Sequence, residues 1–272
     1  MFKWLLLFAG AGLFYLWLKG KKQAELNAAN SPKPNNHKPK TVFVPEVMVQ
    51  CECCKVHLPQ SDAITFDNRF YCSKEHLHAL DSKGWLGEAR WKISPNQDAR
   101  PENISPDLVV IHHISLPPGE FKNQSSSHHI VDFFQNQLDP NGHPYFAEIA
   151  DQKVSSHFLI ARSGELIQFV STQSKAWHAG KSDFLGREKC NDFSIGIELE
   201  GDGDTPFVEI QYQVLSNLIK KLASTYPDLK FAGHSDIAPI RKTDPGIYFD
   251  WKKFQKETGI SVEKLPFGLE AR

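Results

Sequence analysis

Two histidines and an aspartate stand where predicted strands and loops of this sequence end, and side chains of these types can hold a catalytic zinc ion. His112 ends the apolar run VVIHH, and His234 follows the apolar stretch LKFAG. Asp244 lies two positions after Lys242 in RKTDPG, so both side chains point the same way if that segment is extended. Two imidazoles and one carboxylate from different elements would bind zinc and leave one coordination position for water.

Hydrolysis at such a zinc ion needs two further groups, and the sequence offers one candidate for each. Zinc polarises a carbonyl and lowers the pKa of its bound water to about 7, but a proton acceptor and an oxyanion partner are still required. Glu198 shares a face of the predicted strand DFSIGIELEG with a glycine and is the candidate base. Lys242 is the candidate oxyanion partner. Each also has a simpler interpretation, Glu198 as a half-exposed strand carboxylate and Lys242 as a solvated loop charge.

The run from Val109 to Ile111 determines where His112 can lie. Its β-branched residues predict a short strand, and the lack of alternation predicts burial on both faces, as in the centre of an α/β sheet. His112 and His113 should then point to opposite faces of the sheet. A buried imidazole needs a partner. From this stretch alone, a hydrogen-bonded core histidine and a metal ligand are therefore equally good interpretations.

The segments around these groups predict a layered α/β domain. The stretch VSSHFLIARSGELIQFV predicts a β-hairpin that turns at Ser163 and Gly164, and residues 192–201 alternate as a strand does. The stretch LKFAGHSDIAP predicts a strand that leads into a loop. A helix is predicted before Pro227, with apolar residues at helical spacing at Ile210, Val214, Leu218, Ile219, Leu222 and Ala223. Strands mixed with amphipathic helices imply α/β layers.

A second metal site is predicted in the cysteine-rich segment 51–76. Its candidate ligands come in two pairs, C-x-x-C and C-x-x-x-H: Cys51 with Cys54, and Cys72 with His76. Thiolates and an imidazole suit a closed structural zinc site, which would supply the folding energy of so small a module. Cys53 and His57 compete for a ligand place, so the spacing alone leaves the exact set open.

The N-terminus predicts a membrane anchor. Its apolar run WLLLFAGAGLFYLWL, residues 4–18, is slightly shorter than the roughly 17 to 25 residues of a spanning helix. A cleaved signal peptide has a similar length, but KGKK follows directly where a signal peptide would place small residues. The lysines after the run outnumber Lys3 before it, so the positive-inside rule puts the rest of the chain in the cytoplasm.

Composition and length divide the chain into parts and argue against nucleic-acid binding. Its 31 Lys and Arg residues balance 32 Asp and Glu residues, which gives no basic footprint. Residues 20–46 are rich in Lys, Asn and Pro and predict a flexible tether. The predicted parts are an anchor (1–19), the tether (20–46), the cysteine module (47–83) and a catalytic domain (84–272).

Six sequence blocks, in order, resemble the AmpD-type amidases, the anhydro-N-acetylmuramyl-L-alanine amidases of bacterial cell-wall recycling. The blocks are VVIHHISLPPGEF, AEIADQKVSSHFLI, AWHAG, GREKCNDFSIGIELEG, GHSDIAP and RKTDPG, within about residues 85–265. The wider family is similar to phage T7-type lysozyme amidases and peptidoglycan recognition proteins. The resemblance implies a mixed β-sheet flanked by helices, with a zinc cleft on one side. It also implies hydrolysis of the amide between the lactyl group of muramic acid and L-alanine of the stem peptide.

Carried over position by position, the resemblance implies zinc ligands at His112, His234 and Asp244, and a catalytic pair of Glu198 and Lys242. It also implies contacts with the muropeptide, at Trp177 near the sugar, at His113, and at two lysines where relatives often place arginine: Lys153 and Lys189. Lysine cannot grip a carboxylate in the bidentate way of arginine, so the preferred stem peptide is an open question.

The cysteine segment is similar to the zinc-ribbon segment of small bacterial membrane-anchored proteins that end in YCS-x-EH. It lacks a basic helix, which favours a structural or interaction role over nucleic-acid binding. Together these observations predict a zinc amidase of muropeptides tethered to the cytoplasmic face of the membrane. The alternatives are a periplasmic amidase of intact peptidoglycan and a non-catalytic muropeptide sensor. A sensor is disfavoured because all the predicted ligands and both catalytic candidates are present.

Overall fold

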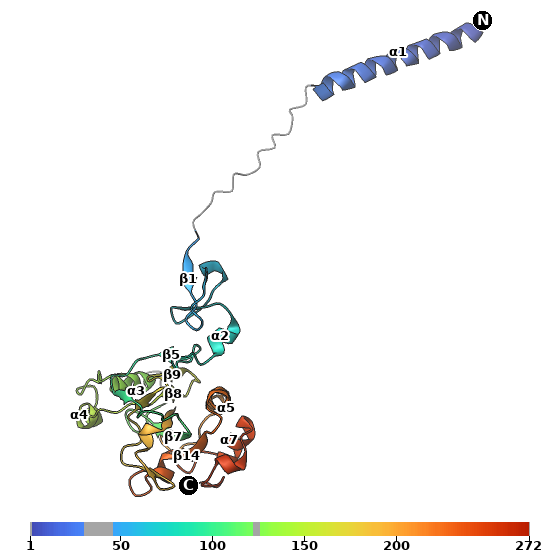
Figure 1. The fold of residues 1–272 in the computed structure, drawn as a ribbon. Helices are drawn as coiled ribbons and strands as arrows, with labels where there is room; N and C mark the ends of the chain where they lie inside the picture. The colour runs from blue at the N-terminus through green and yellow to red at the C-terminus, as the bar shows by residue number, and fades with distance from the viewer. Residues whose placement is uncertain (1, 30–45, 122–125, 272) are drawn as a thin grey trace. The chain divides into compact units, whose positions relative to one another are not determined.

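The computed structural model describes residues 2–29, 46–121 and 126–271 (Figure 1), without the side chains of residues 2–13, 28, 29 and 126. The chain divides into two compact units, residues 1–45 and 46–272. The first contains helix α1, Phe2–Ala29. The predicted anchor, residues 4–18, lies in this helix, but most of its side chains lie outside the described residues. Where side chains are described, no helix is both long enough and apolar enough to cross a membrane.

The predicted tether is partly wrong, because its first residues continue helix α1 to Ala29. The lysines at 21 and 22 and the residues after them, such as Gln23, Ala24 and Glu25, are strong helix formers, which outweigh the effect of Gly20. The remaining part of the predicted tether, residues 30–45, lies outside the described residues.

The second unit is built on a mixed β-sheet with the strand order β14-β7-β13-β8-β9-β5. The strands in that order are Lys230–Gly233, Leu108–Ile114, Ser194–Glu200, Phe158–Ile160, Leu166–Gln168 and Arg90–Trp91. Strands β14, β7, β13 and β8 are parallel to one another, and β9 is antiparallel to β8. The predicted mixed α/β fold, the central strand that carries His112 and the hairpin at 154–170 are therefore confirmed.

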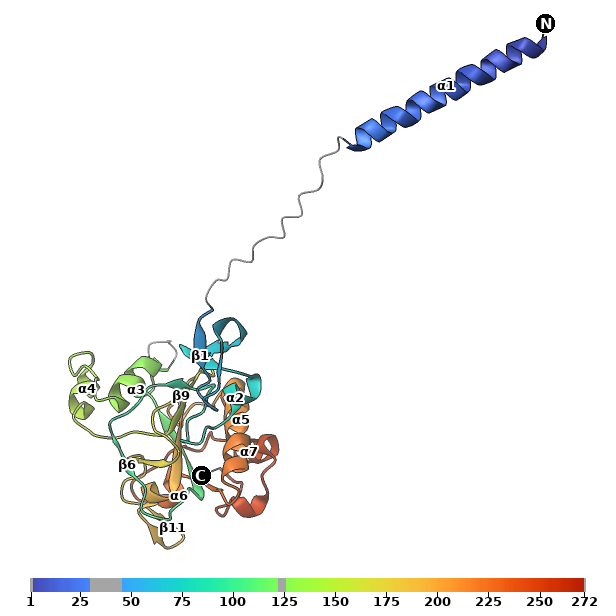
Figure 2. The ribbon, with the colours of Figure 1, turned by 45° about the horizontal axis from the view of Figure 1, so that its top comes forward.

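Helices cover both faces of the sheet (Figure 2). On one face, α5 (Glu209–Thr225) and α7 (Trp251–Thr258) share a core with the side chains of Val109 and Ile197. On the other, α3 (Ser126–Phe134) and α4 (Pro144–Ile149) pack around Leu159. Alternation along β7 and β13 therefore sends odd-numbered residues toward α5 and leaves even-numbered residues, including His112 and Glu198, for the opposite face.

Two local predictions need correction. The predicted stripe of α5 is confirmed at Leu218, Ile219 and Leu222, but Ile210 is 40% exposed and Leu215 is buried in addition. The predicted loop after β14 begins instead with a short helix, α6 (His234–Ile237). The Asp236 carboxylate accepts a hydrogen bond of 2.7 Å from the Gly233 amide and stabilises the start of that helix.

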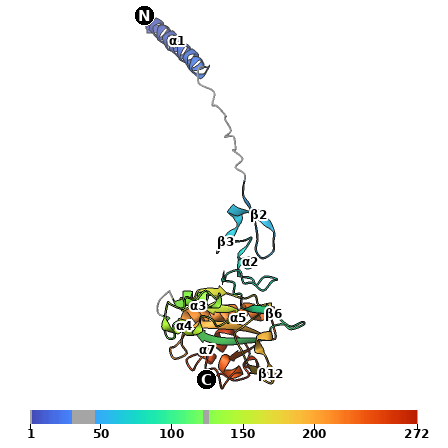
Figure 3. The same cartoon turned by 90° about the vertical axis from the view of Figure 1, so that its left-hand side faces the viewer.

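The cysteine module consists of two hairpins and a short helix at one end of the second unit (Figure 3). Its elements are β1 (Met48–Gln50), β2 (His57–Pro59), β3 (Ile64–Phe66), β4 (Arg69–Tyr71) and α2 (Lys74–His78). The module packs directly on the sheet domain, since the Arg69 guanidinium donates to the Ala89 carbonyl at 2.6 Å and lies 3.8 Å from the ring centroid of Trp91. The division of the chain at residue 84 stays a prediction, but residues on both sides of it belong to one compact unit.

The remaining elements are short and belong to the connections of the sheet domain. Strands β6 (Gln97–Ala99) and β10 (Ser174–Ala176) pair with each other, as do β11 (Asp183–Phe184) and β12 (Arg187–Glu188). Single 3-10 turns cover Gln60–Asp62, Cys190–Asp192 and Val262–Lys264. The connection from β10 to β11 passes beside the ends of β7 and β13 and contributes to the site described next.

Candidate active site

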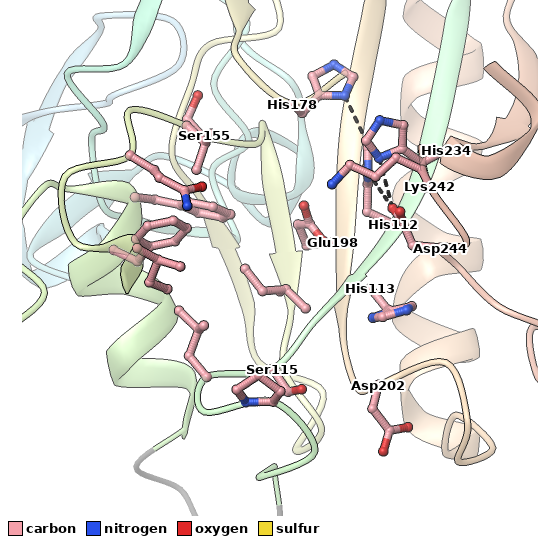
Figure 4. Close-up of a pocket in the computed structure, with 18 of the residues that line it drawn as sticks. His112, His113, Ser115, Ser155, His178, Glu198, Asp202, His234, Lys242 and Asp244 are labelled. Atoms are coloured by element: carbon pink, nitrogen blue, oxygen red, sulfur yellow. Dashed lines mark hydrogen bonds and ion pairs between the residues drawn. The ribbon is translucent and has the colours of Figure 1, made fainter. Parts of the chain in front are cut away.

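A cavity of about 440 Å³ opens where β7 and β13 end, on the face of the sheet that α3 and α4 cover (Figure 4). The parallel register places Glu198 of β13 directly beside His112 of β7. The segment after β14 supplies His234, at the start of α6, and then Lys242 and Asp244 in the following loop. Strand ends and the loops that follow them therefore bring the predicted metal ligands and the predicted catalytic pair to one cavity.

The three predicted zinc ligands converge at the end of β7. Oδ2 of Asp244 lies 2.8 Å from Nδ1 of His112 and 3.1 Å from Nδ1 of His234. The donor atoms all lie within 4.8 Å of one another, and each residue is at most 8% exposed. The structure thus places them together as the sequence predicts, while the binding of a metal by this set stays a prediction.

The charges of this group suit a divalent cation. Burial, and then the neighbouring His234, lower the pKa of His112 to about 4, so its imidazole is neutral at pH 7. Burial acts to raise the pKa of Asp244, but hydrogen bonds to the two imidazoles outweigh it and hold that pKa below its ordinary value. A neutral imidazole such as that of His112 and an ionised carboxylate are the forms that bind zinc.

Backbone contacts hold the loop of Asp244 against the start of α6. The Ser235 amide donates to the Asp244 carbonyl at 2.8 Å. A Cβ atom on Gly233 would lie 2.7 Å from Cδ of Pro245, so only glycine allows this close approach. The spacing between His234 and Asp244 is therefore set by packing of the backbone and does not depend on a metal ion.

The segment AWHAG supports both imidazoles from behind. Nε2 of His112 lies 2.9 Å from Nδ1 of His178, and Nε2 of His234 lies 3.1 Å from the carbonyl oxygen of Ala179. Burial and the neighbouring imidazoles lower the pKa of His178 well below its ordinary value, so this ring is neutral as well. The sequence analysis did not identify His178. Its position next to Trp177 in a block already chosen for its resemblance was the available signal.

Glu198 has the properties of a proton acceptor. Its side chain is buried, and Oε2 has no hydrogen-bond partner among the described residues. Burial, and then the charge of Asp244, raise the pKa of Glu198 well above its ordinary value. Lys242 points into the same cavity from the opposite wall (Figure 4). A carboxylate made more basic and an ammonium group therefore flank the space beside the predicted metal ligands.

The predicted substrate contacts are only partly brought to the cavity. Trp177 lines it and donates from Nε1 to Oδ2 of Asp98 at 2.8 Å, and His113 lies at its edge. Lys153 and Lys189 are exposed and are not among its lining residues, so their contact with the muropeptide stays a prediction. Lys153 precedes the residues that reach the wall, and Lys189 has a left-handed backbone (φ 59°) ahead of the turn at Cys190–Asp192 and lines a separate cavity.

The cysteine module holds a second group of possible metal ligands: Cys51, Cys54, Cys72 and His76. Sγ of Cys54 and Sγ of Cys72 are 3.8 Å apart, which is about the separation of two sulfur atoms each 2.3 Å from one tetrahedral centre. Burial acts to raise the pKa of the Cys51 thiol, but hydrogen bonds with the backbone amides of the knuckle lower it to about 6. Cys53 and His57 are not part of this group. Geometry thus favours one of the ligand sets that the spacing left open.

Comparison with known proteins gives a consistent result for the sheet domain. The sequence profile of the N-acetylmuramoyl-L-alanine amidase family matches residues 102–247. The chain is 49% identical over 187 residues to a 1,6-anhydro-N-acetylmuramyl-L-alanine amidase of Salmonella typhimurium strain SL1344, covering 68% of this chain and 98% of the relative. It is 50% identical over 178 residues to the corresponding Escherichia coli K12 protein, covering 65% and 95%. A crystal structure of a selenomethionine AmpD derivative superposes with a TM-score of 0.62 and 49% identity, covering 65% of this chain and 97% of that one.

Proposed function

The chain belongs to the N-acetylmuramoyl-L-alanine amidase family, and from that premise we propose that it is a zinc-dependent enzyme that cleaves anhydromuramyl peptides in the cytoplasm. It is an N-acetylmuramoyl-L-alanine amidase of muropeptide recycling, as its relatives at about 50% identity are. The observation that supports zinc dependence is the convergence of His112, His234 and Asp244 beside a buried, basic Glu198.

The residues of the cavity divide the reaction among themselves. Zinc held by the two imidazoles and Asp244 would polarise the scissile carbonyl and lower the pKa of a water ligand to about 7. Glu198 accepts the proton of the attacking water and delivers it to the amine nitrogen as the carbon–nitrogen bond breaks. The Lys242 ammonium group stabilises the negative charge that develops on the carbonyl oxygen. Trp177 offers its indole to the sugar at the cavity wall.

The test is a direct assay of the full chain with anhydromuramyl tripeptide, together with a count of zinc per chain. We expect release of free peptide, and we expect Asp244→Ala to lose both hydrolysis and one equivalent of zinc. Zinc binding without hydrolysis would favour a muropeptide sensor, and hydrolysis that survives chelation would contradict zinc dependence. The same assay with intact peptidoglycan as a second substrate distinguishes an enzyme of recycling from one of wall degradation. Release of peptide from intact peptidoglycan would indicate wall degradation.

We also propose a structural zinc ion in the cysteine module. The support is the tetrahedral spacing of the Cys54 and Cys72 sulfur atoms and the lowered pKa of Cys51, which favours the thiolate form that binds metal. The module has few buried side chains of its own, although Tyr71 is 1% exposed and donates to the Gly87 carbonyl. A metal ion would therefore supply much of its stability.

A membrane anchor at residues 4–18 with the rest of the chain in the cytoplasm is a proposal from the sequence alone. Its support is the uncharged apolar run and the excess of lysines directly after it. Membrane fractionation of the full chain and of a chain lacking residues 1–29, followed by protease treatment of intact spheroplasts, tests both points. Protection from protease in the membrane fraction is expected. Cleavage of the sheet domain from outside would instead support the periplasmic amidase.

A further inference from the structure

A continuous chain of hydrogen bonds connects the predicted ligand His112 to a backbone carbonyl behind the site. Nε2 of His112 lies 2.9 Å from Nδ1 of His178, whose Nε2 lies 3.0 Å from Oγ of Ser194. That hydroxyl in turn lies 2.6 Å from the carbonyl oxygen of Cys190. Figure 4 shows the first contact as a dashed line that starts at the His178 ring.

The carbonyl at the far end fixes the direction of every proton in this chain. A carbonyl oxygen only accepts, so the single Ser194 hydroxyl proton is donated to Cys190. His178 must then donate from Nε2 to the Ser194 oxygen. Because a neutral imidazole carries one N–H group, Nδ1 of His178 is left as an acceptor. His112 therefore donates from Nε2, and its Nδ1 is the nitrogen atom that faces Asp244.

The second imidazole is oriented by the same rule with a shorter connection. Nε2 of His234 lies 3.1 Å from the carbonyl oxygen of Ala179, to which it can donate, and 3.5 Å from Nη2 of Arg241. With Nε2 as the donor, Nδ1 is the nitrogen atom of His234 that can bind a metal. The Nδ1 atoms of both imidazoles face the same oxygen of Asp244, at 2.8 and 3.1 Å. A cation between them would be bound by all three atoms.

We infer that His178 is a positioning residue that fixes His112 in the tautomer able to bind metal through Nδ1. The inference rests on the proposed zinc site and goes beyond it. It assigns part of the zinc affinity of this site to a residue that does not touch the ion. Groups that hydrogen-bond to metal ligands typically contribute 10- to 100-fold to metal affinity.

The sheet itself is shaped to accept the His178 ring. A Cβ atom on Gly196 of β13 would lie 2.6 Å from Cγ of His178, so the ring packs directly on the glycine backbone. Gly196→Ala would displace the ring while every hydrogen-bonding group of the chain stays present. This substitution is a second, independent way to break the contact between His178 and His112.

The experiment compares three substitutions in the full chain by chelator competition for zinc. The zinc followed is the equivalent that Asp244→Ala loses. His178→Leu removes the acceptor, whereas Oδ1 of His178→Asn can take the place of Nδ1. We expect affinity to fall about 10- to 100-fold in His178→Leu and in Gly196→Ala, with partial recovery in His178→Asn. Equal affinities in wild type and His178→Leu would overturn the inference.

His157→Asn is the matched control. This imidazole is also fully buried and lies 5.7 Å from His178 between ring centroids, but it accepts from the Gly196 amide and makes no contact with a predicted ligand. It should lower the thermal stability without changing the affinity of the catalytic zinc. Equal losses of zinc affinity in His157→Asn and His178→Leu would show a general packing effect and overturn the inference.

Nitrogen-15 spectra of the imidazoles give a readout that packing alone would not move. In the zinc-loaded wild type, His112 should show a metal-bound Nδ1 and a protonated Nε2, and binding through Nε2 would overturn the inference. The outcome is separable from that of the proposed function. A wild type that binds zinc and cleaves muropeptide while His178→Leu keeps full affinity contradicts only the inference, whereas a wild type without this zinc contradicts both.

Discussion

Oδ2 of Asp244 lies 2.8 Å from Nδ1 of His112, a residue 132 positions earlier in the chain. The contact joins the end of a central strand to the loop that follows the edge strand β14. Neither residue is more than 8% exposed, and the same oxygen of Asp244 also lies 3.1 Å from Nδ1 of His234. A buried carboxylate shared between two imidazoles is the feature that most strongly indicates a bound cation.

Asp244→Asn keeps the shape of this side chain and removes its charge. We expect the chain to lose one zinc equivalent, with affinity at that site reduced more than the roughly 10- to 100-fold typical of an outer-sphere contact. Hydrolysis of anhydromuramyl tripeptide should fall to background. Metal analysis after dialysis checks the first point, and chromatography of released peptide the second. Full zinc content in the variant would mean that this carboxylate is not a ligand.

Glu198→Gln should abolish proton transfer and leave the zinc in place. A positioned acid–base group contributes about 10²- to 10⁴-fold to rate, so kcat should fall by that factor. Glu200→Gln is the matched control, since Glu200 is 3% exposed on the same strand and its Oε2 accepts from the Arg162 amide at 2.7 Å. Comparable losses of kcat in the two variants would argue against a special role for Glu198.

Glu198 also predicts how the stability of the metal-free protein depends on pH. Its folded-state pKa is raised, by burial and then by Asp244, so ionisation is less favourable in the folded chain than in the unfolded chain. Its contribution to stability is therefore full below the ordinary carboxyl pKa and is lost as the pH rises to the folded value. Each tenfold difference in acidity corresponds to about 1.4 kcal/mol.

Glu198→Gln removes this loss, because glutamine does not ionise. The metal-free variant should be more stable than metal-free wild type at neutral pH, and the difference should shrink toward acid pH. Urea unfolding at a series of pH values, in the presence of a chelator, measures it. A difference that is constant over pH would mean that Glu198 ionises with an ordinary pKa in the folded chain.

Much of this site could be predicted because its signals are local. The apolar run before His112 determines a buried strand, and the alternation of 192–201 determines which face of β13 Glu198 occupies. Lys242 and Asp244 are two positions apart, and in an extended segment such side chains point the same way. These patterns depend only on neighbouring residues, and the resemblance to amidases supplied the order in which the strands and loops meet.

What could not be predicted depends on contacts between distant segments. His178 supports His112 across 66 positions, and no pattern around either residue encodes that pairing. On α5 the buried position of Gln211 could not be predicted, because this polar residue is buried where it donates to the Glu200 carbonyl at the end of β13. Lys153 and Lys189 were assigned from the resemblance to amidases, and their exposure depends on the course of their loops.

Two neighbouring cysteines provide a paired test of the structural metal. Cys54 belongs to the ligand group and Cys53 does not. We expect Cys54→Ser to lose one zinc equivalent and to unfold at a lower temperature, whereas Cys53→Ser should keep the wild-type zinc content. Both cysteine variants should retain the other zinc equivalent, which is the one that Asp244→Asn loses. Loss of metal in Cys53→Ser and not in Cys54→Ser would mean that the other candidate ligand set is used.

Trp177 should contribute to binding of the muropeptide and little to the chemical step. Its indole lines the cavity and is held by the hydrogen bond from Nε1 to Asp98, so the ring is already oriented before substrate arrives. Loss of an aromatic contact of about 0.5 to 1.5 kcal/mol predicts that Trp177→Ala raises KM roughly 2- to 12-fold with kcat nearly unchanged. Trp177→Phe keeps an aromatic face but loses the Nε1 donor, so its KM should lie between those of wild type and Trp177→Ala. Steady-state kinetics on anhydromuramyl tripeptide, with zinc content measured in parallel, distinguish this from damage to the metal site. A fall in kcat at unchanged KM and full zinc content would show that Trp177 acts in the transition state and not in binding.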